Sequence, residues 1–533
     1  MKPFGRASRH CTVMVQAAGF FIGLMTLCNT AVFADEQQKS GLDKHEIVFM
    51  TASRIEEMIL AHKITSAEVV DAYIEQIKKV NPKLNAIVTL DEQGARRRAK
   101  EADDALAKGV VWGPLHGVPV TIKDNYATAG IRSTNSDPEH ADFIPDFDAT
   151  VVARLKKAGA IILGKENLPM MAMDYQTNSP VFGVTNNPWD VSRTPGGSTG
   201  GGGAAVASGM TTISLGNDLG GSIRIPSHFC GVYGMKPTEH LVSGFGVPPY
   251  LPKAEFNSVR HLISQGPLAR SIDDLKLCLK VIAGPDVRDV NVPFIGFVEL
   301  RQKPLKELRI AWSDDFGGLP VSADTRRALK DFAEKLSAQG CRVEKLNPPD
   351  FNFTGAWNTY GKIMDMELGV YNPAFARFVT FAFGWYYRMD VPFLSTVYPI
   401  SFKKYVRALT ERDEYVSRME SFLSQYDVWL CPVTATPAYA HIKPDRYFGP
   451  YPLYSKPVMV DNKPVNYLAA NGCYTTIFNL TGNPVVVMPI GYAGDGMPIG
   501  IQVVGSRWHD MELLNYAKQL DAVAKAFRSP AGY

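Results

Sequence analysis

Two glycine-rich loops carry serines that could do chemistry. The first, RTPGGSTGGGGAAVASG, spans residues 193–209 and contains Ser198. It does not match a phosphate-binding loop, because such a loop places Lys and then Ser or Thr after the last glycine, whereas two alanines and a valine follow here. Small residues also allow two backbones to approach closely. By itself, this loop fits a packing site and a reactive hydroxyl equally well.

The second loop, LGNDLGGSIRIP, spans residues 215–226 and contains Ser222. Two glycines directly before this serine allow neighbouring backbone N–H groups to converge on one point, as an oxyanion hole requires. The groups expected to converge belong to Leu219, Gly220, Gly221 and Ser222. The sequence therefore predicts a serine that lies beside its own anion site.

A serine nucleophile needs a base, and the ten histidines offer no good candidate. His116 and His228 fit local packing or hydrogen bonding better than catalysis. A lysine can serve as the base when burial lowers its pKa. Lys123 ends the apolar stretch GVPVTIKDN, which would draw its ammonium group toward the interior of a sheet. An exposed lysine paired with Asp124 is the other interpretation.

Nothing in the sequence predicts a metal or another cofactor. There is no HExxH motif, no Cys/His cluster and no loop rich in carboxylates. The five cysteines beyond residue 34 are widely spaced and odd in number, so buried free thiols are expected rather than disulfides. They are Cys230, Cys278, Cys341, Cys431 and Cys473.

The first 34 residues have the layout of a secretory signal peptide. Three basic residues precede an uncharged run whose most apolar part is AAGFFIGLMTL, and small residues lead to Ala34. This apolar part is short for a membrane-spanning helix, which needs about 20 residues. We predict an exported protein, periplasmic or secreted, that is cleaved after Ala34 and has no stable membrane insertion afterwards. An uncleaved anchor is the other interpretation.

The charge balance argues against several classes of partner. The full chain has 56 Lys and Arg against 53 Asp and Glu, and the first 34 residues hold three of the basic residues and none of the acidic ones. The remainder is therefore neutral, with 53 of each. Neither nucleic acid nor an anionic membrane surface is an expected partner.

Helices and strands alternate along much of the chain, which predicts an α/β sheet covered by helices on both faces. A later repeat of this pattern, over residues 308–346, is expected to extend the first sheet, because no linker rich in Pro, Ser or Gly intervenes. The predicted helices cover 51–107, 149–157 and 323–339, and the predicted strands cover 117–125, 160–163, 210–216, 308–312 and 341–346.

Aromatic residues are dense between Phe351 and Tyr405, for example in FARFVTFAFGWYYRM. Packing of helices in the core is the common explanation of such a segment. The alternative is that some of these rings line an apolar substrate pocket.

Three segments together resemble the amidase signature family. Its pattern has a lysine in GVPxxxKD, a Gly-Gly-Ser-(Ser/Thr)-Gly-Gly loop and a DxGGSxRxP loop, and this chain has GVPVTIKDN, GGSTGG and NDLGGSIRIP in the same order. The three candidate residues, Lys123, Ser198 and Ser222, are separated by 75 and 24 positions. Thr199 stands where a second serine is common in the family. Weaker similarity covers most of the chain beyond residue 34.

The resemblance implies a single amidase domain over residues 35–533, after a signal peptide over 1–34. Its fold is expected to be a large mixed, twisted β-sheet covered by helices on both faces. The catalytic core would cover about 110–265, and a variable substrate-pocket region about 350–465. The implied activity is hydrolysis of a carboxylic or peptide-terminal amide to an acid and ammonia or an amine, with no cofactor.

The resemblance also implies a role for each candidate residue. Ser222 is the nucleophile that forms an acyl intermediate, Ser198 is a bridging hydroxyl, and Lys123, uncharged at rest, is the base of a Ser-Ser-Lys triad. Family structures hold the peptide bond before the bridging serine in the cis form. Asp218 and Arg224, on either side of the nucleophile, are expected to support the loop backbone and not to react.

Two other functions stay open at the level of sequence. The amidase subunit of a tRNA-dependent amidotransferase is in the same family but works with partner subunits in the cytosol, which the predicted signal peptide disfavours. A catalytically inactive binding protein on an amidase scaffold is disfavoured because all three triad residues are present. The sequence predicts neither the particular small-molecule or peptide amide nor the oligomeric state, and a homodimer is among the alternatives.

Overall fold

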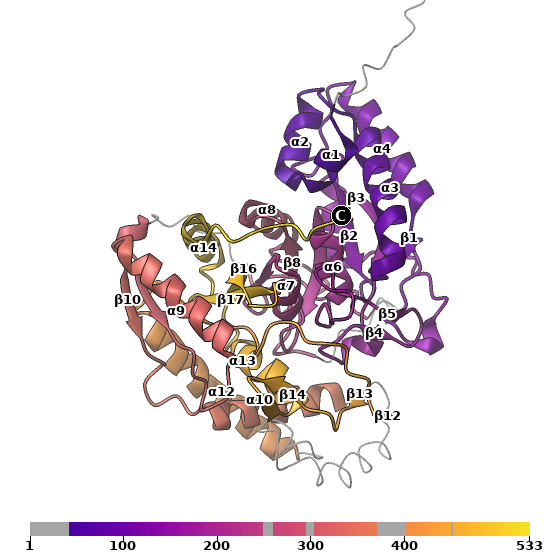
Figure 1. Ribbon diagram of the computed structural model, residues 1–533. Coiled ribbons are helices and arrows are strands. Elements are labelled where there is room, and N and C mark those ends of the chain that lie inside the picture. Colours follow the sequence, from indigo (N-terminus) through magenta and orange to yellow (C-terminus); the bar gives the residue numbers. More distant parts are fainter. Residues whose placement is uncertain (1–41, 249–258, 295–302, 370–400, 449–450) are drawn as a thin grey trace, which may run out of the picture. The chain divides into compact units, whose positions relative to one another are not determined.

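An eleven-stranded mixed sheet runs through the compact unit that begins at Gly41 (Figure 1). The computed structural model describes residues 42–248, 259–294, 303–369, 401–448 and 451–533. The strands follow one another across the sheet in the order β1 (Ile87–Leu90), β3 (Ile161–Glu166), β2 (Pro119–Lys123), β6 (Ile213–Asp218), β8 (Ser264–Ala269), β7 (Tyr233–Lys236), β16 (Val485–Tyr492), β17 (Pro498–Val504), β11 (Val428–Pro432), β9 (Arg309–Trp312) and β10 (Arg342–Lys345).

Parallel pairing is confined to two places in this sheet. Strand β2 lies parallel to β3 and β6, and β9 lies parallel to β10 and β11, whereas the other neighbours are antiparallel. In the part of the chain that the structure describes, three further sheets have two strands each. They are formed by β4 (Asn178–Ser179) with β5 (Gly183–Val184), β12 (Arg446–Phe448) with β13 (Tyr451–Leu453), and β14 (Val458–Val460) with β15 (Lys463–Val465).

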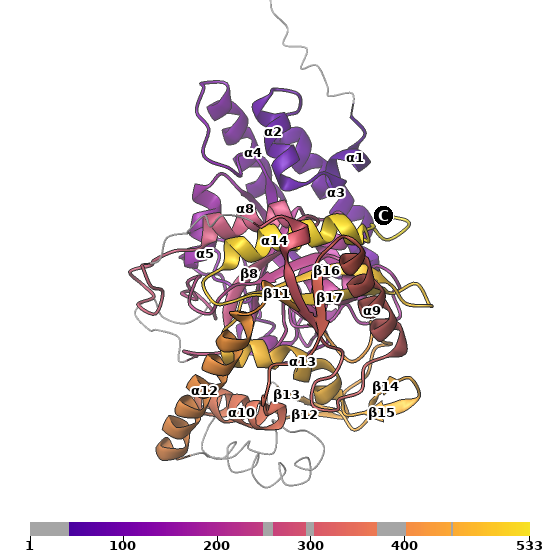
Figure 2. The same ribbon diagram turned by 90° about the vertical axis from the view of Figure 1, so that its left-hand side faces the viewer.

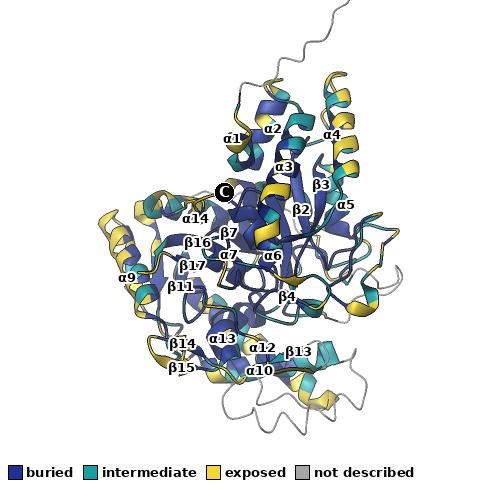
Figure 3. Ribbon diagram, turned by 45° about the vertical axis from the view of Figure 1, so that its right-hand side comes forward, coloured by how far each residue is buried: buried dark blue, intermediate teal, exposed yellow. Residues whose placement is uncertain are grey.

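The α-helices among the described residues are α1 (Lys44–Phe49), α2 (Ala52–Leu60), α3 (Ser66–Leu84), α4 (Glu92–Leu106), α5 (Thr150–Lys157), α6 (Gly200–Ala207), α7 (Arg224–Cys230), α8 (Ile272–Ile282), α9 (Ala323–Ala338), α10 (Phe353–Gly369), α12 (Phe402–Leu423), α13 (Tyr467–Thr481) and α14 (Asp510–Ala524). Several outer helices, such as α3, α4 and α9, direct their apolar sides to the core and leave charged sides exposed, whereas α6, α7 and α13 are buried along all or nearly all of their length (Figure 3). Helix α3 starts with a capping box between Thr65 and Glu68, as its sequence TSAE favours. Helices α8 and α14 pack against each other (Figure 2).

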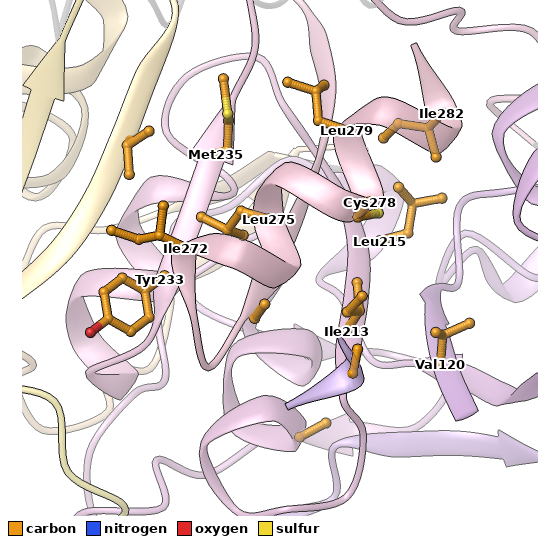
Figure 4. Packing of buried hydrophobic residues seen from close by; sticks show 14 of the residues in the cluster. Val120, Ile213, Leu215, Tyr233, Met235, Ile272, Leu275, Cys278, Leu279 and Ile282 are labelled. Carbon is orange, nitrogen blue, oxygen red and sulfur yellow. The ribbon is translucent and has the colours of Figure 1, made fainter. Parts of the chain in front are cut away.

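The two faces of the sheet differ in character near β6. On the face covered by α8, Ile213 and Leu215 belong to one apolar cluster with Leu275 (Figure 4). Side chains alternate along a strand, so Ser214 points to the opposite face, where a Cβ on Gly202 of α6 would lie 2.1 Å from its hydroxyl oxygen. The predicted fold, a large mixed sheet with helices on both faces, is confirmed. The α6 face is polar and closely covered.

Most predicted elements are present with small shifts at their ends. The helical prediction over 51–107 is wrong at Ile87–Leu90, which forms β1 between α3 and α4 and pairs with β3. This segment, IVTL, is short and β-branched, and pairing with a buried neighbour decides its structure. The repeat over 308–346 extends the same sheet, as expected, because β9 pairs with β11.

Two expectations fall on residues outside those described. The signal peptide over 1–34 is one, and the aromatic stretch over 370–400 is the other. Among the described residues, no helix is long and apolar enough to cross a membrane. The five cysteines expected to be free and buried are so.

Strand β3 approaches β1 so closely that a Cβ on Gly164 would lie 2.0 Å from the carbonyl oxygen of Thr89. Gly164→Ala should therefore lower the free energy of unfolding by about 1–3 kcal/mol, measured by urea denaturation. The control is Gly491→Ala in β16, where the nearest atom would be 3.9 Å from the new Cβ. Equal losses in the two variants would contradict this account of the packing.

Candidate active site

Lys123 is the last residue of β2, and its side chain is completely buried. Its side chain points to the α6 face of the sheet, because its hydrogen-bond partner Ser198 lies just before that helix. Its amino group donates hydrogen bonds to Ser198 Oγ at 2.7 Å and to Asn217 Oδ1 at 2.8 Å. The alternative of an exposed lysine paired with Asp124 is therefore wrong.

The burial of Lys123 favours the uncharged form of its amine. Burial lowers the pKa of Lys123 to about 7, although the carboxylates of Asp218 and Glu166 act in the opposite direction. A large fraction of the lysine is therefore a neutral amine at neutral pH. A neutral amine within hydrogen-bond distance of a hydroxyl can accept its proton.

Ser198 lies just before α6, at a place where two backbone segments pack closely. A Cβ on Gly197 would lie 2.7 Å from the carbonyl oxygen of Asp174, and one on Gly201 would lie 2.5 Å from the amide nitrogen of Asn167. The Gly197–Ser198 peptide bond is cis, as the resemblance implies. The glycines of this loop thus permit close packing, and the same loop presents a hydroxyl to the buried lysine.

An ion pair inside the molecule supports the loop that carries Ser222. The carboxylate of Asp218 accepts hydrogen bonds from the backbone N–H groups of Gly221 at 2.8 Å and Ile223 at 3.1 Å. It also accepts two from the buried guanidinium of Arg224, at 2.8 and 3.0 Å. Burial alone would raise the pKa of Asp218, but Arg224 holds it well below its usual range. The carboxylate therefore stays charged.

Of the four N–H groups expected to face an oxyanion, that of Gly221 has another partner. The N–H of Gly221 donates to Asp218 Oδ1, because that carboxylate lies against the turn, and it is not free for a substrate. The N–H groups of Leu219, Gly220 and Ser222 make no hydrogen bond to any residue that the structure describes. These three N–H groups are therefore not engaged by another described residue, and their role as oxyanion donors stays a prediction.

A backbone contact joins the two serine loops. The N–H of Thr199 donates to the carbonyl oxygen of Ser222 at 3.1 Å. Within the described ranges, no hydrogen bond links the hydroxyl of Ser198 to that of Ser222. Ser222 is 8% exposed and Ser198 only 1%, so Ser222 is the more accessible of the two residues.

Two tyrosine hydroxyls converge on the turn before Ser222. A Cβ on Gly220 would lie 3.1 Å from the hydroxyl of Tyr360 and 3.2 Å from that of Tyr175. Tyr360 donates a hydrogen bond to the carbonyl oxygen of Leu219 at 3.0 Å. The turn is therefore bordered by aromatic side chains from two segments that are distant in sequence.

The aromatic segment after residue 350 is described only in part. In α10, Phe353 and Trp357 pack in an apolar cluster with Phe316 and Trp429, which agrees with the core interpretation. Tyr360, one turn further along α10, belongs to the same cluster, and its hydroxyl also reaches the candidate site.

The two histidines considered from the sequence bond to backbone elsewhere. Nδ1 of His116 accepts a hydrogen bond from the N–H of Trp112 at 3.1 Å, and Nδ1 of His228 accepts one from the N–H of Gly500 at 2.7 Å. Burial lowers the pKa of His228 to about 4. Both side chains have the local roles expected of them. No group of three or more metal-ligating side chains is present in the described part of the chain.

Sequence reasoning missed several residues of this site. Asn217 and Glu166 could have been found, since they follow the predicted strands 210–216 and 160–163 by one and three positions, and the observed strands β6 and β3 both neighbour that of Lys123. Tyr175 and Tyr360 carry no local signal, because their proximity to the loop arises from the tertiary fold alone.

The fold and this site define an enzyme class. The amidase family model matches residues 68–514, and the chain belongs to that family. It is accordingly an amidase signature enzyme, whose reaction is hydrolysis at amide C–N bonds.

Three relatives show how similar the chain is to other members of the family. Compared with the A subunit of the glutamyl-tRNA(Gln) amidotransferase from Geobacillus thermodenitrificans, the chain is 32% identical over 91% of its own length and 97% of the relative's. It is 34% identical to indoleacetamide hydrolase of Bradyrhizobium diazoefficiens, over 86% and 83%. The solved structure of 6-aminohexanoate cyclic dimer hydrolase superposes with a TM-score of 0.74 at 25% identity, covering 91% of this chain and 99% of that one.

Removing the cation of the buried ion pair should destabilise the fold. Arg224→Met leaves the Asp218 carboxylate buried without its partner, so the free energy of unfolding should fall by about 3–5 kcal/mol in urea denaturation. The control is Lys100→Met, which removes an exposed pair with Asp104 and should cause no measurable change. A loss in Arg224→Met as small as that in the control would contradict the role of the pair.

Proposed function

We propose that the protein hydrolyses an amide C–N bond through an acyl intermediate on Ser222. The observation that carries this proposal is the hydrogen bond of 2.7 Å between the buried amine of Lys123 and the hydroxyl of Ser198. The loop of Ser198 is in turn hydrogen-bonded, through the N–H of Thr199, to the backbone carbonyl of Ser222. A lysine that burial keeps partly uncharged is suited to start a proton relay.

In the proposed reaction, Lys123 takes the proton of Ser198 as Ser198 takes that of Ser222. Ser222 Oγ attacks the amide carbon, and the resulting oxyanion accepts hydrogen bonds from the loop N–H groups. Protons return along the same path to the leaving nitrogen, the C–N bond breaks, and water then hydrolyses the acyl ester. The two serine hydroxyls must rotate into a hydrogen bond for this transfer, since catalytic hydrogen bonds often form fully only with substrate present.

Two biological settings are compatible with this chemistry: a subunit of an amidotransferase complex, and an exported amidase that acts alone. The 32% identity to an amidotransferase component over most of both chains favours a protein that acts together with partner subunits, and on similarity alone this is the better supported setting. The signal-peptide layout of residues 1–34 favours an exported amidase that acts alone on a carboxylic or peptide-terminal amide, and the relationship to an indoleacetamide hydrolase is compatible with it.

Labelling with a fluorophosphonate tests the nucleophile. The probe should modify the wild type, and Ser222→Ala should abolish both labelling and amide turnover, measured by mass spectrometry and by product release over a panel of aliphatic, aryl and peptide amides. Ser192→Ala, an exposed serine of the same region, is the control and should retain both. Undiminished labelling in Ser222→Ala would overturn the assignment, and the absence of turnover on any amide would favour an inactive binding protein.

Cell fractionation with N-terminal sequencing separates the two settings. An exported amidase should be recovered outside the cytosol with Asp35 as its first residue, because cleavage after Ala34 removes the signal. Recovery from the cytosol with an intact N-terminus and in a complex with partner subunits would contradict export and favour the amidotransferase setting.

A further inference from the structure

Glu166 is a buried acid that the proposed reaction does not use. It ends β3 and has no exposed surface. In the parallel register between β2 and β3 it is paired with Lys123. The residue beside Lys123 in the sheet is therefore a carboxylic acid. It lies on a neighbouring strand, at the usual spacing of about 4.8 Å.

The side chain of Glu166 is fixed on the same face of the sheet as Lys123. The hydroxyl of Thr121, on β2, donates to Oε1, and the hydroxyl of Ser214, on β6, donates to Oε2 at 2.8 Å. Helix α6 closes over the acid, since a Cβ on Gly202 would lie 2.7 Å from Oε2. Three strands and a glycine helix thus hold this carboxyl group away from water.

The other charged groups near this acid can be named element by element. Helix α6 consists of Gly, Ala and Val and contributes none. On β3 itself, Lys165 is buried but is bonded to Ser133 Oγ and to the carbonyl oxygen of Tyr126. Lys123 on β2 acts on this acid directly, the buried hydroxyl of Tyr126 is a further titratable group that interacts with it, and Asp218 at the end of β6 acts on Lys123.

The interaction between Glu166 and Lys123 is mutual. Burial raises the pKa of Glu166 to about 7, and Lys123 and Lys165 act against that rise. In turn, the carboxylate of Glu166 opposes the lowering of the Lys123 pKa by burial. Each group therefore changes the charge state of the other in the pH range where the lysine titrates.

We infer that Glu166 is a positioning residue of the Lys123–Ser198 pair, whose carboxylate stabilises the ammonium form of Lys123 and so sets the pH above which the lysine acts as a base. This inference rests on the proposed function, because it takes Lys123 as the base of the relay.

The test replaces Glu166 by Gln and follows the pH dependence of Ser222 labelling by a fluorophosphonate. In that reaction Ser222 Oγ forms a bond to phosphorus, fluoride leaves, and the serine proton passes to the relay, so the rate reports on Lys123 without knowledge of the amide. Glutamine matches glutamate in shape, and the hydroxyls of Thr121 and Ser214 can rotate to donate or accept, so both hydrogen bonds can be kept.

The labelling rate of the wild type should fall as the pH drops through about 7, because the amine becomes protonated. In Glu166→Gln the ammonium form loses a favourable charge, so the midpoint of this fall should move to lower pH by roughly one unit. The matched control is Asp510→Asn, a buried carboxylate bonded to Thr238, which should leave the midpoint unchanged.

Ser214→Ala provides a second variant if Glu166→Gln does not fold. It removes a hydrogen bond to the carboxylate form of Glu166, so the midpoint should move in the same direction by a smaller amount. Coincident midpoints in the wild type and the folded variants, or an equal shift in Asp510→Asn, would overturn the inference while labelling of Ser222 leaves the proposed function intact. A wild type that is not labelled at Ser222 would overturn both.

Discussion

The removal of one lysine amine from water is the constraint on which the rest of the site depends. A buried ammonium is costly, and the cost is relieved when the group gives up its proton. The hydrogen-bond partners of Lys123, Ser198 and Asn217, are neutral, so neither holds the proton on the amine as a directly bonded carboxylate would. The nearby acids, Glu166 and Asp218, limit the shift and leave the pKa at about 7, where the amine can both accept and return a proton.

Burial of that amine requires a cover without side chains. Helix α6 meets this need because its first four residues are glycines, and added Cβ atoms there would overlap the backbone at Asn167 and the side chains of Ser214 and Glu166. Its glycines cost helix propensity, which the close packing offsets. The loop before α6 therefore serves two purposes at once: it packs the helix onto the polar face of the sheet, and it presents Ser198 to Lys123.

The nucleophile loop depends on a different part of the chain. The Asp218–Arg224 pair is fully buried, and such a pair is stable only when the remaining hydrogen-bonding capacity of both ions is satisfied. Arg224 donates to the carbonyl oxygen of Thr475, to Asn479 of α13 and to Gln502 of β17. The position of Ser222 is thus tied to segments more than 250 positions further along the chain.

The sequence by itself determined the alternation of strands and helices, the end of an apolar strand at Lys123 and the two glycine loops, because strand periodicity and glycine turns are local properties. It did not predict β1, the orientation of the Gly221 N–H, or the positions of Glu166 and Tyr360. These were decided by the tertiary structure: strand register puts Glu166 beside Lys123, and the packing of α10 brings Tyr360 to the loop. The pKa of the lysine belongs to this second group, since desolvation depends on every segment that covers the amine.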